Sequence, residues 1–238
     1  FQYAVGRALA KKTNHELVLD SKSGFARDLK YKRKFELGKF SINARIANIF
    51  EVMVNVLFAI DNKLFKKKIL KKVNLDVRWY GCFLTEGFEM KYIQISPKYI
   101  SNRTTSMIGY WQSPRYFSDY KDMILNELSP SAPSDQKYLK MGNRMLNEES
   151  VSICIRVYEE SDNPLNHSKN GKMKTASEIN KAIEKILKNR ENLTFFVFCT
   201  HRAKIINDLK LPKPTVFVTC DDGYDQTYET LWLLSQCR

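Results

Sequence analysis

The alternation of hydrophobic and polar positions is clearest in residues 150–157, where it predicts a β-strand. Its apolar side consists of Val151, Ile153, Ile155 and Val157. Its polar side ends with Arg156, and two acidic residues, Glu159 and Glu160, follow. Because open α/β sheets bind ligands at the carboxyl ends of their strands, Arg156 is a candidate for binding a diphosphate. An ion pair between Arg156 and a neighbouring acid is the alternative.

The residues that follow predict two further strands, each followed by a helix. Residues 175–178 have the spacing of a capping box, and an apolar stripe on a helix comes after them. Residues 193–199 are almost all apolar, as in a strand that is covered on both faces. A short helix at 203–209, a buried strand at 215–220 and a helix from 227 onward complete the series. Such alternation is typical of a parallel, doubly wound sheet.

The first half is less regular and predicts a separate α/β domain. The expected elements are a helix at 1–12, a strand at 16–20, a buried helix at 49–60, a strand at 107–111 and a helix at 116–128. Between 78 and 95 we expect a strand pair or an irregular β region, with a turn at Glu86-Gly87. The Pro- and Ser-rich residues 129–138 mark the best boundary candidate. We therefore expect domains at 1–138 and 139–238. Both ends of the chain read as cut, so we expect a fragment.

Composition adds a strong positive charge to this picture. Lys and Arg outnumber Asp and Glu by 39 to 26, which gives a net charge of +13. This charge favours a polyanionic partner: nucleic acid, an anionic membrane face or a phosphorylated small molecule. A hydrophobic content of 43% excludes wholesale disorder. Five cysteines without C-x-x-C spacing argue against a disulfide framework and against zinc, and they favour the cytoplasm.

Residues 64–73 form a basic amphipathic segment. Its lysines are Lys66, Lys67, Lys68, Lys71 and Lys72. A peripheral contact with an anionic membrane, such as the inner membrane, is one interpretation, and a solvated helix face is the other. The longest apolar run, at 49–60, is too short to span a bilayer.

Polar residues follow each predicted strand of the second half. They are Arg156, Glu159 and Glu160 after the first strand, Cys199-Thr200-His201-Arg202 after the second, and Asp221 and Asp222 after the third. Because the carboxyl ends of parallel strands open on one edge, we expect these clusters to converge there. The long loop at 158–174, which carries His167, adds to this expectation. The set suits an anionic ligand with hydroxyl groups, such as a nucleotide sugar.

Several other kinds of site lack support in the sequence. The chain has no G-x-x-x-x-G-K-S/T, no G-x-G-x-x-G after a strand and no G-x-S-x-G. Its three histidines show no metal-ligand spacing, so we expect no metal. His167 is equally well explained as an exposed loop residue, and the Asp221-Asp222 pair as a helix cap.

Three segments carry a family resemblance: F-Q-Y-A-V-G-R-A-L-A at 1–10, L-V-L-D at 17–20 and G-Y-W-Q-S-P-R-Y-F at 109–117. In order and spacing they resemble the bacterial alpha-1,2-fucosyltransferases, glycosyltransferase family 11. That family has a strand ending in H-x-R-R-G-D. Here Cys154 replaces the His and Val157 the second Arg, and C-T-H at 199–201 replaces an acid pair. The chain is similar to a variant branch with this pattern.

The resemblance implies a GT-B-like fold, in which two Rossmann-type domains face a cleft. It implies an inverting, metal-independent transfer of fucose from GDP-fucose, without a cofactor, to a galactose-containing glycan that is free or lipid-linked. The N-terminal domain would bind the acceptor and the C-terminal domain the nucleotide sugar. By resemblance, Arg156, His201, Asp221 and Asp222 would bind the donor, while Gln2, Tyr110, Gln112 and His167 would line the pocket.

The mechanism expected from this resemblance is a direct displacement. An acceptor hydroxyl attacks the anomeric carbon, and Arg156 stabilises the charge that develops on the β-phosphate. Glu159, Glu160 and Asp222 are the candidates for the general base. A non-catalytic nucleotide-sugar- or glycan-binding relative and a basic nucleic-acid-binding protein are the alternatives, although no nucleic-acid recognition motif is present.

Overall fold

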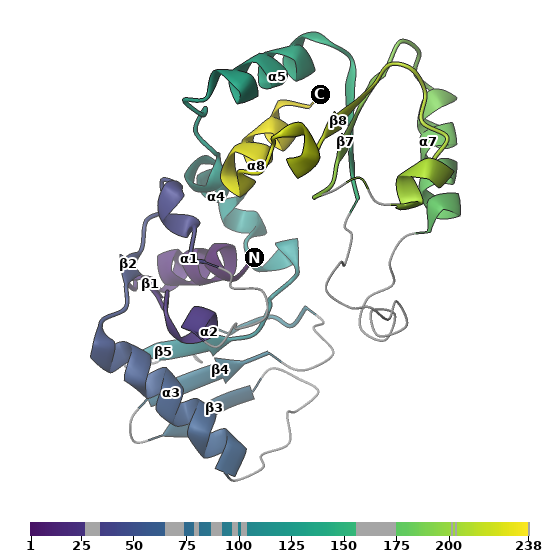
Figure 1. Ribbon diagram of the computed structural model, residues 1–238. Helices are drawn as coiled ribbons and strands as arrows, with labels where there is room; N and C mark the ends of the chain where they lie inside the picture. The colour runs from purple at the N-terminus through teal and green to yellow at the C-terminus, as the bar shows by residue number, and fades with distance from the viewer. Residues whose placement is uncertain are drawn as a thin grey trace. The chain divides into compact units, whose positions relative to one another are not determined.

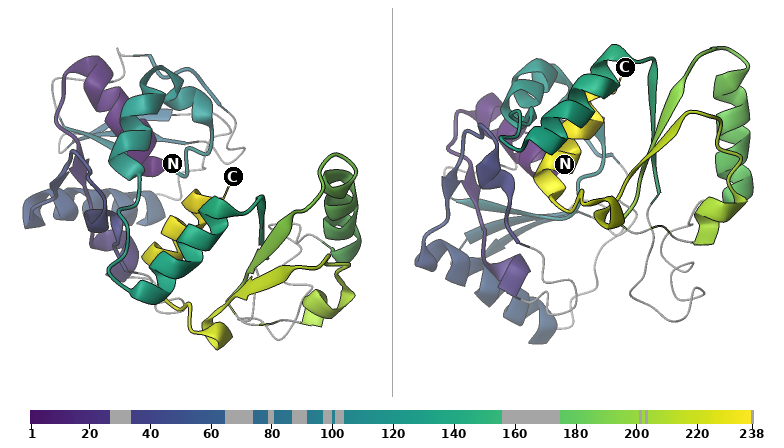
Figure 2. Two further views of the ribbon diagram at one scale, coloured as in Figure 1. Left: turned by 90° about the horizontal axis from the view of Figure 1, so that it is seen from above. Right: turned by 45° about the horizontal axis from the view of Figure 1, so that its top comes forward.

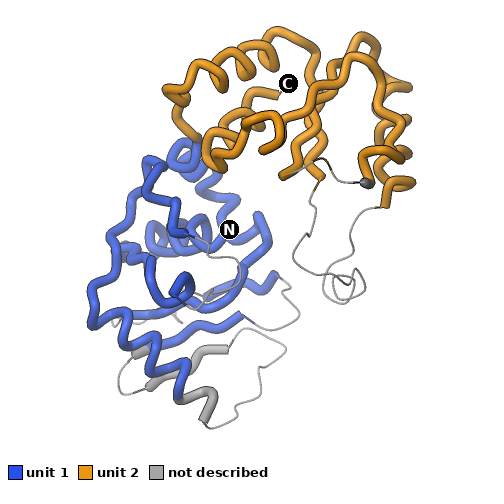
Figure 3. The backbone as a smooth tube through the Cα atoms, viewed as in Figure 1, with its two compact units in different colours: residues 1–129 blue, residues 130–238 orange. Residues whose placement is uncertain are grey.

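The computed structural model describes residues 1–26, 34–64, 74–78, 81–86, 92–96, 100, 104–155, 175–200, 202 and 204–237. The chain divides into two compact units, Phe1–Ser129 and Pro130–Arg238 (Figure 3). The division lies at the start of the Pro- and Ser-rich segment. Both units mix helices with strands, and both contain parallel strand pairs.

Unit 1 is an α/β assembly with two small sheets (Figure 1). Its elements are α1 (Gln2–Thr13), β1 (Val18–Leu19), α2 (Ser23–Ala26), β2 (Arg45–Ile46), α3 (Ile49–Leu64), β3 (Asn74–Arg78), β4 (Gly81–Thr85), β5 (Thr105–Ile108) and α4 (Lys121–Leu128). Strands β1 and β2 pair in parallel. Strand β4 pairs antiparallel with β3 and parallel with β5.

Helix α1 is central to the core of unit 1. Val5 packs with Leu84 of β4 and with Trp111, while Ala4 and Ala8 pack with Ile124 of α4. Small side chains on α1 let the neighbouring elements approach closely. Helix α3 packs against β4 through an aromatic stack in which the ring centroids of Phe58 and Phe83 lie 3.8 Å apart.

Two predictions for unit 1 are confirmed only in part. One strand of the expected pair is β4, but the strands it pairs with are β3 and β5. Gly87 of the expected Glu86-Gly87 turn lies outside the described residues, and Glu86 continues the pairing of β4 with β5 because its N–H donates to the Ile108 carbonyl oxygen at 2.8 Å. The second part of the helix expected at 116–128 is confirmed as α4, whereas its first part is the 3-10 helix Ser118–Tyr120, which follows another at Pro114–Tyr116. Phe117, with φ −135°, interrupts the helical path.

Unit 2 is built on the parallel sheet that the sequence predicts. Its elements are α5 (Gln136–Asn147), β6 (Ser150–Cys154), α7 (Ala176–Leu187), β7 (Thr194–Phe198), a 3-10 helix (Lys204–Asp208), β8 (Thr215–Val218) and α8 (Thr227–Gln236). The strand order is β6-β7-β8, with both pairs parallel. Thr175 caps α7 in the predicted box, since it accepts from the Glu178 N–H at 3.2 Å and donates its own N–H to Glu178 at 2.9 Å.

Helices cover both faces of this sheet (Figure 2). Phe196 and Phe198 of β7 pack against α5 and α8, where Met145 and Leu233 are fully buried. On the other face, Phe195 packs with Ile183 of α7. The prediction that this strand is covered on both sides is therefore confirmed. None of the described helices has the length and hydrophobicity needed to span a bilayer.

The contact between α5 and α8 predicts an unusual effect at Gly142. A Cβ added there would lie 2.4 Å from Cη2 and Cζ3 of Trp232. Glycine to alanine in a helix interior normally stabilises by about 1 kcal/mol. Here overpacking dominates, and we expect Gly142→Ala to lower the free energy of unfolding by about 1–3 kcal/mol in urea denaturation.

Gly38→Ala is the matched control, because no atom lies within 4 Å of the added Cβ. Its unfolding midpoint should stay close to that of the parent chain. A Gly142→Ala variant that is as stable as the parent would contradict the packing of α5 on α8.

A partly buried polar cluster fixes α1 to α4. The Tyr3 hydroxyl donates to a Glu127 carboxylate oxygen and accepts the Asn43 N–H at 3.1 Å. Arg7 pairs with the same carboxylate, with Nε and Nη2 each 2.9 Å from Oε1. Burial, together with the hydrogen bond to Glu127, raises the pKa of Tyr3 to about 12.

This pKa shift predicts an alkaline loss of stability. Between pH 10 and about 12 the unfolded chain has lost the Tyr3 proton that the folded chain keeps, so raising the pH favours unfolding. We expect the free energy of unfolding to fall across this window and Tyr3→Phe to remove part of that slope. Chemical denaturation at several pH values measures the slope. Equal slopes for both proteins would rule out ionisation of Tyr3 as its source.

Candidate functional site

The carboxyl edge of the unit 2 sheet brings two of the predicted polar clusters together. The loop after β7 and the loop after β8 are joined through their main chains, because Cys220 N–H donates to the Thr200 carbonyl oxygen at 2.9 Å. Arg202 links them further. Its N–H donates to Asp221 Oδ2 at 2.9 Å and its Nη2 to Asp222 Oδ1 at 2.7 Å. Residues about twenty positions apart in the sequence thus form one polar cluster.

Asp222 also stabilises the turn that follows β8. Thr219, which is fully buried, donates its hydroxyl to Asp222 Oδ2 at 2.6 Å and accepts the Asp222 N–H at 3.2 Å. Gly223 then ends the turn with φ 79°, a left-handed conformation that favours glycine. Both carboxylate oxygens of Asp222 therefore accept hydrogen bonds from the protein, Oδ1 from Arg202 in the loop after β7 and Oδ2 from Thr219 after β8.

Two cations contribute to this edge: Arg202, which belongs to the predicted cluster after β7, and Lys137, which the sequence did not single out. Arg202 lies over the Phe217 ring, with Cζ 4.6 Å from the centroid. Lys137, in the first turn of α5, donates to the Asp222 carbonyl oxygen and lies 4.3 Å from the Tyr224 ring centroid. The position of Arg202 just after a buried strand is the signal that marked it in the sequence. No local signal marks Lys137.

The cysteines at this edge are poor candidates for nucleophiles. Burial, with Asp221 and Asp222 adding to it, raises the pKa of the Cys199 thiol. Burial likewise raises the pKa of Cys154, at the end of β6. Since the thiolate is the reactive form, the environment disfavours cysteine-based covalent chemistry. In the described ranges, no three His, Cys, Asp or Glu residues are arranged to hold a metal ion.

Five predicted site residues lie outside the described residues. They are Arg156, Glu159, Glu160, His167 and His201. The described chain runs to Ile155, whose N–H donates to the Phe198 carbonyl oxygen at 2.8 Å. Ile155 thus continues the pairing of β6 with β7 and precedes Arg156 directly. The roles assigned to these five residues stay predictions.

Unit 1 gathers Gln2 and Tyr110, two of its three predicted pocket residues, at one turn. Gln2 Nε2 donates to the Gly109 carbonyl oxygen at 2.6 Å, which connects the start of α1 to the turn after β5. Tyr110 follows with 65% of its surface exposed. Gln112, two residues farther on, is exposed as well.

Glu86 is a residue of this turn that sequence reasoning missed. Its carboxylate Oε2 accepts the N–H groups of Tyr110 and Trp111 at 2.7 and 2.8 Å. The side chain is buried, with 7% of the residue exposed. A Glu-Gly pair reads as a surface turn in the sequence, and the long-range partners of this carboxylate leave no local signal.

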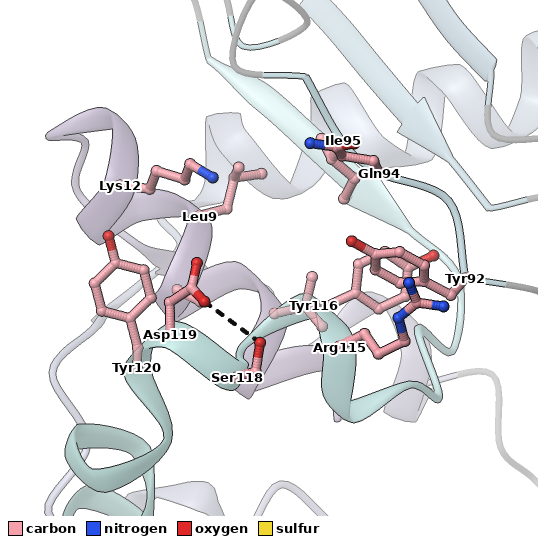
Figure 4. A pocket seen from close by; sticks show the side chains of 12 residues that line it. Leu9, Lys12, Tyr92, Gln94, Ile95, Arg115, Tyr116, Ser118, Asp119 and Tyr120 are labelled. Atoms are coloured by element: carbon pink, nitrogen blue, oxygen red, sulfur yellow. Dashed lines mark hydrogen bonds between the residues drawn. The ribbon is translucent and has the colours of Figure 1, made fainter.

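A pocket of about 330 Å³ lies elsewhere in unit 1, between α1 and the 3-10 helices (Figure 4). Its lining is mixed, with aromatic rings beside charged and polar groups. It includes Lys12, Tyr92, Arg115, Tyr116, Asp119 and Tyr120. Arg115 lies 4.2 Å from the Tyr92 ring centroid, and the Tyr116 hydroxyl accepts the Ile93 N–H at 3.2 Å. Such a volume is at the lower end of the range for small-molecule sites.

Comparison with known proteins gives one finding. The sequence model of Glycosyl transferase family 11 matches residues 23–238. Comparisons with curated proteins and with solved structures gave no match. The matched region contains all of unit 2 and most of unit 1. The chain therefore belongs to glycosyl transferase family 11, a family of glycosyltransferases of the fucosyltransferase type.

Proposed function

We propose that this protein transfers fucose from GDP-fucose to a hydroxyl of a glycan acceptor, namely O2 of a galactose residue. The transfer is an inverting displacement that needs no metal. The family match over residues 23–238 is the observation that carries this proposal. The family as a whole implies a nucleotide-sugar donor and a glycan acceptor.

In this proposal unit 2 binds the donor, and the two units correspond to the halves of a GT-B fold. The carboxyl edge of a parallel sheet is where α/β proteins of this type bind nucleotides. The guanidinium of Arg202 and the ammonium of Lys137 are both at that edge. Positive charge there suits a diphosphate.

The displacement proceeds in one step. The acceptor oxygen forms a bond to C1 of fucose while the bond from C1 to the β-phosphate oxygen breaks, and GDP leaves with the electron pair. Arg156 stabilises the charge that develops on this phosphate. The proton of the acceptor hydroxyl passes to a carboxylate.

The contacts of Asp222 narrow the choice of that carboxylate. Its two oxygens already accept hydrogen bonds from Thr219 and Arg202. A carboxylate held in this way serves better to fix the two loops than to accept a substrate proton. Glu159 and Glu160 are therefore the candidates for the general base.

We further propose that the protein works in the cytoplasm, in contact with the inner membrane. Helix α3 is apolar on both sides, since Val52 and Phe58 are buried while a second stripe is exposed. That stripe consists of Ile49, Phe50, Met53, Leu57 and Ile60, with exposed fractions of 45–75%. Exposed apolar patches of this kind mark interaction surfaces. The lysine-rich residues 64–73 follow α3 in the sequence, so an anionic lipid surface complements the charge of this region.

Arg156→Ala tests the proposed catalytic role. Loss of one group that stabilises the developing charge typically costs 10²–10³-fold in turnover. We expect a fall in kcat of about that size for the transfer of fucose from GDP-fucose to lactose, with an unchanged thermal melting curve. Arg190→Ala is the matched control, because Arg190 is exposed and 3.8 Å from Glu149. It should retain full activity.

The donor is tested separately by thermal protection. We expect GDP-fucose to raise the melting temperature more than GDP-mannose or UDP-galactose does. Protection by GDP-fucose without any transfer would support a non-catalytic binding relative instead. A preference for UDP-galactose would contradict the donor assignment, and unchanged turnover of Arg156→Ala would contradict its role.

Vesicle sedimentation tests the membrane contact. We expect the protein to sediment with phosphatidylglycerol vesicles at low salt, and less so at high salt or with phosphatidylcholine vesicles. Replacing Phe50 and Met53 by serine should reduce binding. Leu125→Ser, on the exposed side of α4, is the control. If the double variant instead abolishes a dimer seen by gel filtration, a second copy of the chain covers this face and the membrane proposal fails.

A further inference from the structure

The buried carboxylate of Glu86 accepts hydrogen bonds from the backbone of the turn that carries Tyr110. Glu86 follows β4 directly and is tied to β5 through its own N–H, 2.8 Å from the Ile108 carbonyl oxygen. From this fixed position Oε2 accepts two successive N–H groups, those of Tyr110 and Trp111. Successive backbone N–H groups that converge on one anion form a rigid arrangement.

Backbone conformation and packing restrict the residues on both sides of Tyr110 in this turn. Gly109 has φ 150°, and a Cβ there would lie 2.4 Å from Cβ of Glu86. Trp111 has φ 54°, which non-glycine residues adopt rarely, and its side chain is 1% exposed in the cluster with Val5 and Leu84. Gln2 binds the Gly109 carbonyl oxygen. The constraints on both neighbours leave the side chain of Tyr110 as the exposed part of the turn.

This arrangement is costly for a turn that serves only the fold. Within the described part of the chain, Glu86 Oε1 and Trp111 Nε1 are buried and lack a hydrogen-bond partner. A buried carboxylate with one unpartnered oxygen is expensive. Unfavourable backbone conformations and unsatisfied polar atoms concentrate at functional sites. A neutral, fully satisfied side chain would hold an ordinary surface turn at lower cost.

We propose that Glu86 is a positioning residue, which holds the Tyr110 ring as a stacking platform for a sugar ring of the acceptor. A tyrosine ring offers a large apolar face with only two side-chain torsions to fix, so it binds a planar ligand face at low entropic cost. The C–H groups on one face of a pyranose are such a surface. This inference rests on the proposed glycan transfer and assigns the acceptor, rather than the donor, to this turn.

The test uses four variants of the full chain, with lactose as acceptor and GDP-fucose as donor. Tyr110→Ala should raise the KM for lactose at least 10-fold and leave the KM for GDP-fucose unchanged, while Tyr110→Phe should stay near the parent. Glu86→Leu should raise the KM for lactose by a similar factor. Glu86→Gln keeps an oxygen for both N–H groups, so it should restore the parent value.

A double variant shows whether Glu86 acts through Tyr110. If it does, Glu86→Leu combined with Tyr110→Ala has the same KM for lactose as Tyr110→Ala alone. The proposal is overturned if the two substitutions multiply their effects on the KM for lactose in the double variant. It is also overturned if Glu86→Leu raises the KM for lactose and the KM for GDP-fucose equally. Should Glu86→Leu fail to fold, Glu86→Asp, which draws the carboxylate back by one methylene, takes its place with the same expectations.

A binding measurement separates this inference from the proposed activity. If the parent chain transfers no fucose, the proposed function fails, and lactose binding is then compared by saturation-transfer NMR. Loss of the lactose signal in Tyr110→Ala, with retention in Tyr110→Phe and Glu86→Gln, would support the platform. Equal binding by parent and Tyr110→Ala, or no binding by the parent, would overturn it.

Discussion

The burial of both faces of β7 is the constraint on which unit 2 depends. Phe195, Phe196 and Val197 are fully inaccessible to solvent, so helices must cover the sheet on both sides. Burying side chains of this size stabilises by about 1.5–3 kcal/mol each. A strand buried in this way can place polar residues only at its ends. The polar residues that follow β7 therefore meet those that follow β8 at one edge, where their main chains and side chains bond to each other.

Much of unit 2 follows from sequence because its signals are local. The almost continuous apolar run of β7, the capping box at Thr175 and the alternation of strands and helices each act within a few residues, and each is confirmed. In unit 1 the decisive interactions are long-range. The partners of Glu86 lie 24 and 25 residues away, so its local sequence suggested a turn where the structure has a buried acid.

The candidate site also combines features that local sequence patterns predict with features that they do not. The convergence of residues after β7 and β8 follows from the geometry of parallel strands, which the alternation pattern revealed. The pairing of side chains inside that cluster does not follow from this geometry. Whether Asp222 binds Arg202, Thr219 or a ligand depends on distances of a few tenths of an ångström between loops, which hydrophobic periodicity does not determine. Lys137 enters the cluster from a helix more than eighty residues upstream.

The two units share a way of fixing loops that carry exposed side chains. In unit 2, Asp221 accepts the backbone N–H of Arg202, and in unit 1, Glu86 accepts those of Tyr110 and Trp111. A carboxylate that accepts hydrogen bonds from backbone N–H groups fixes the backbone of a loop and leaves the side chain that the loop carries exposed. Arg202 and Tyr110 accordingly remain more than half exposed although their backbones are held. In the proposed transfer, which orients two sugars, this combination would fix the proposed contact residues in advance while leaving their surfaces open to ligand.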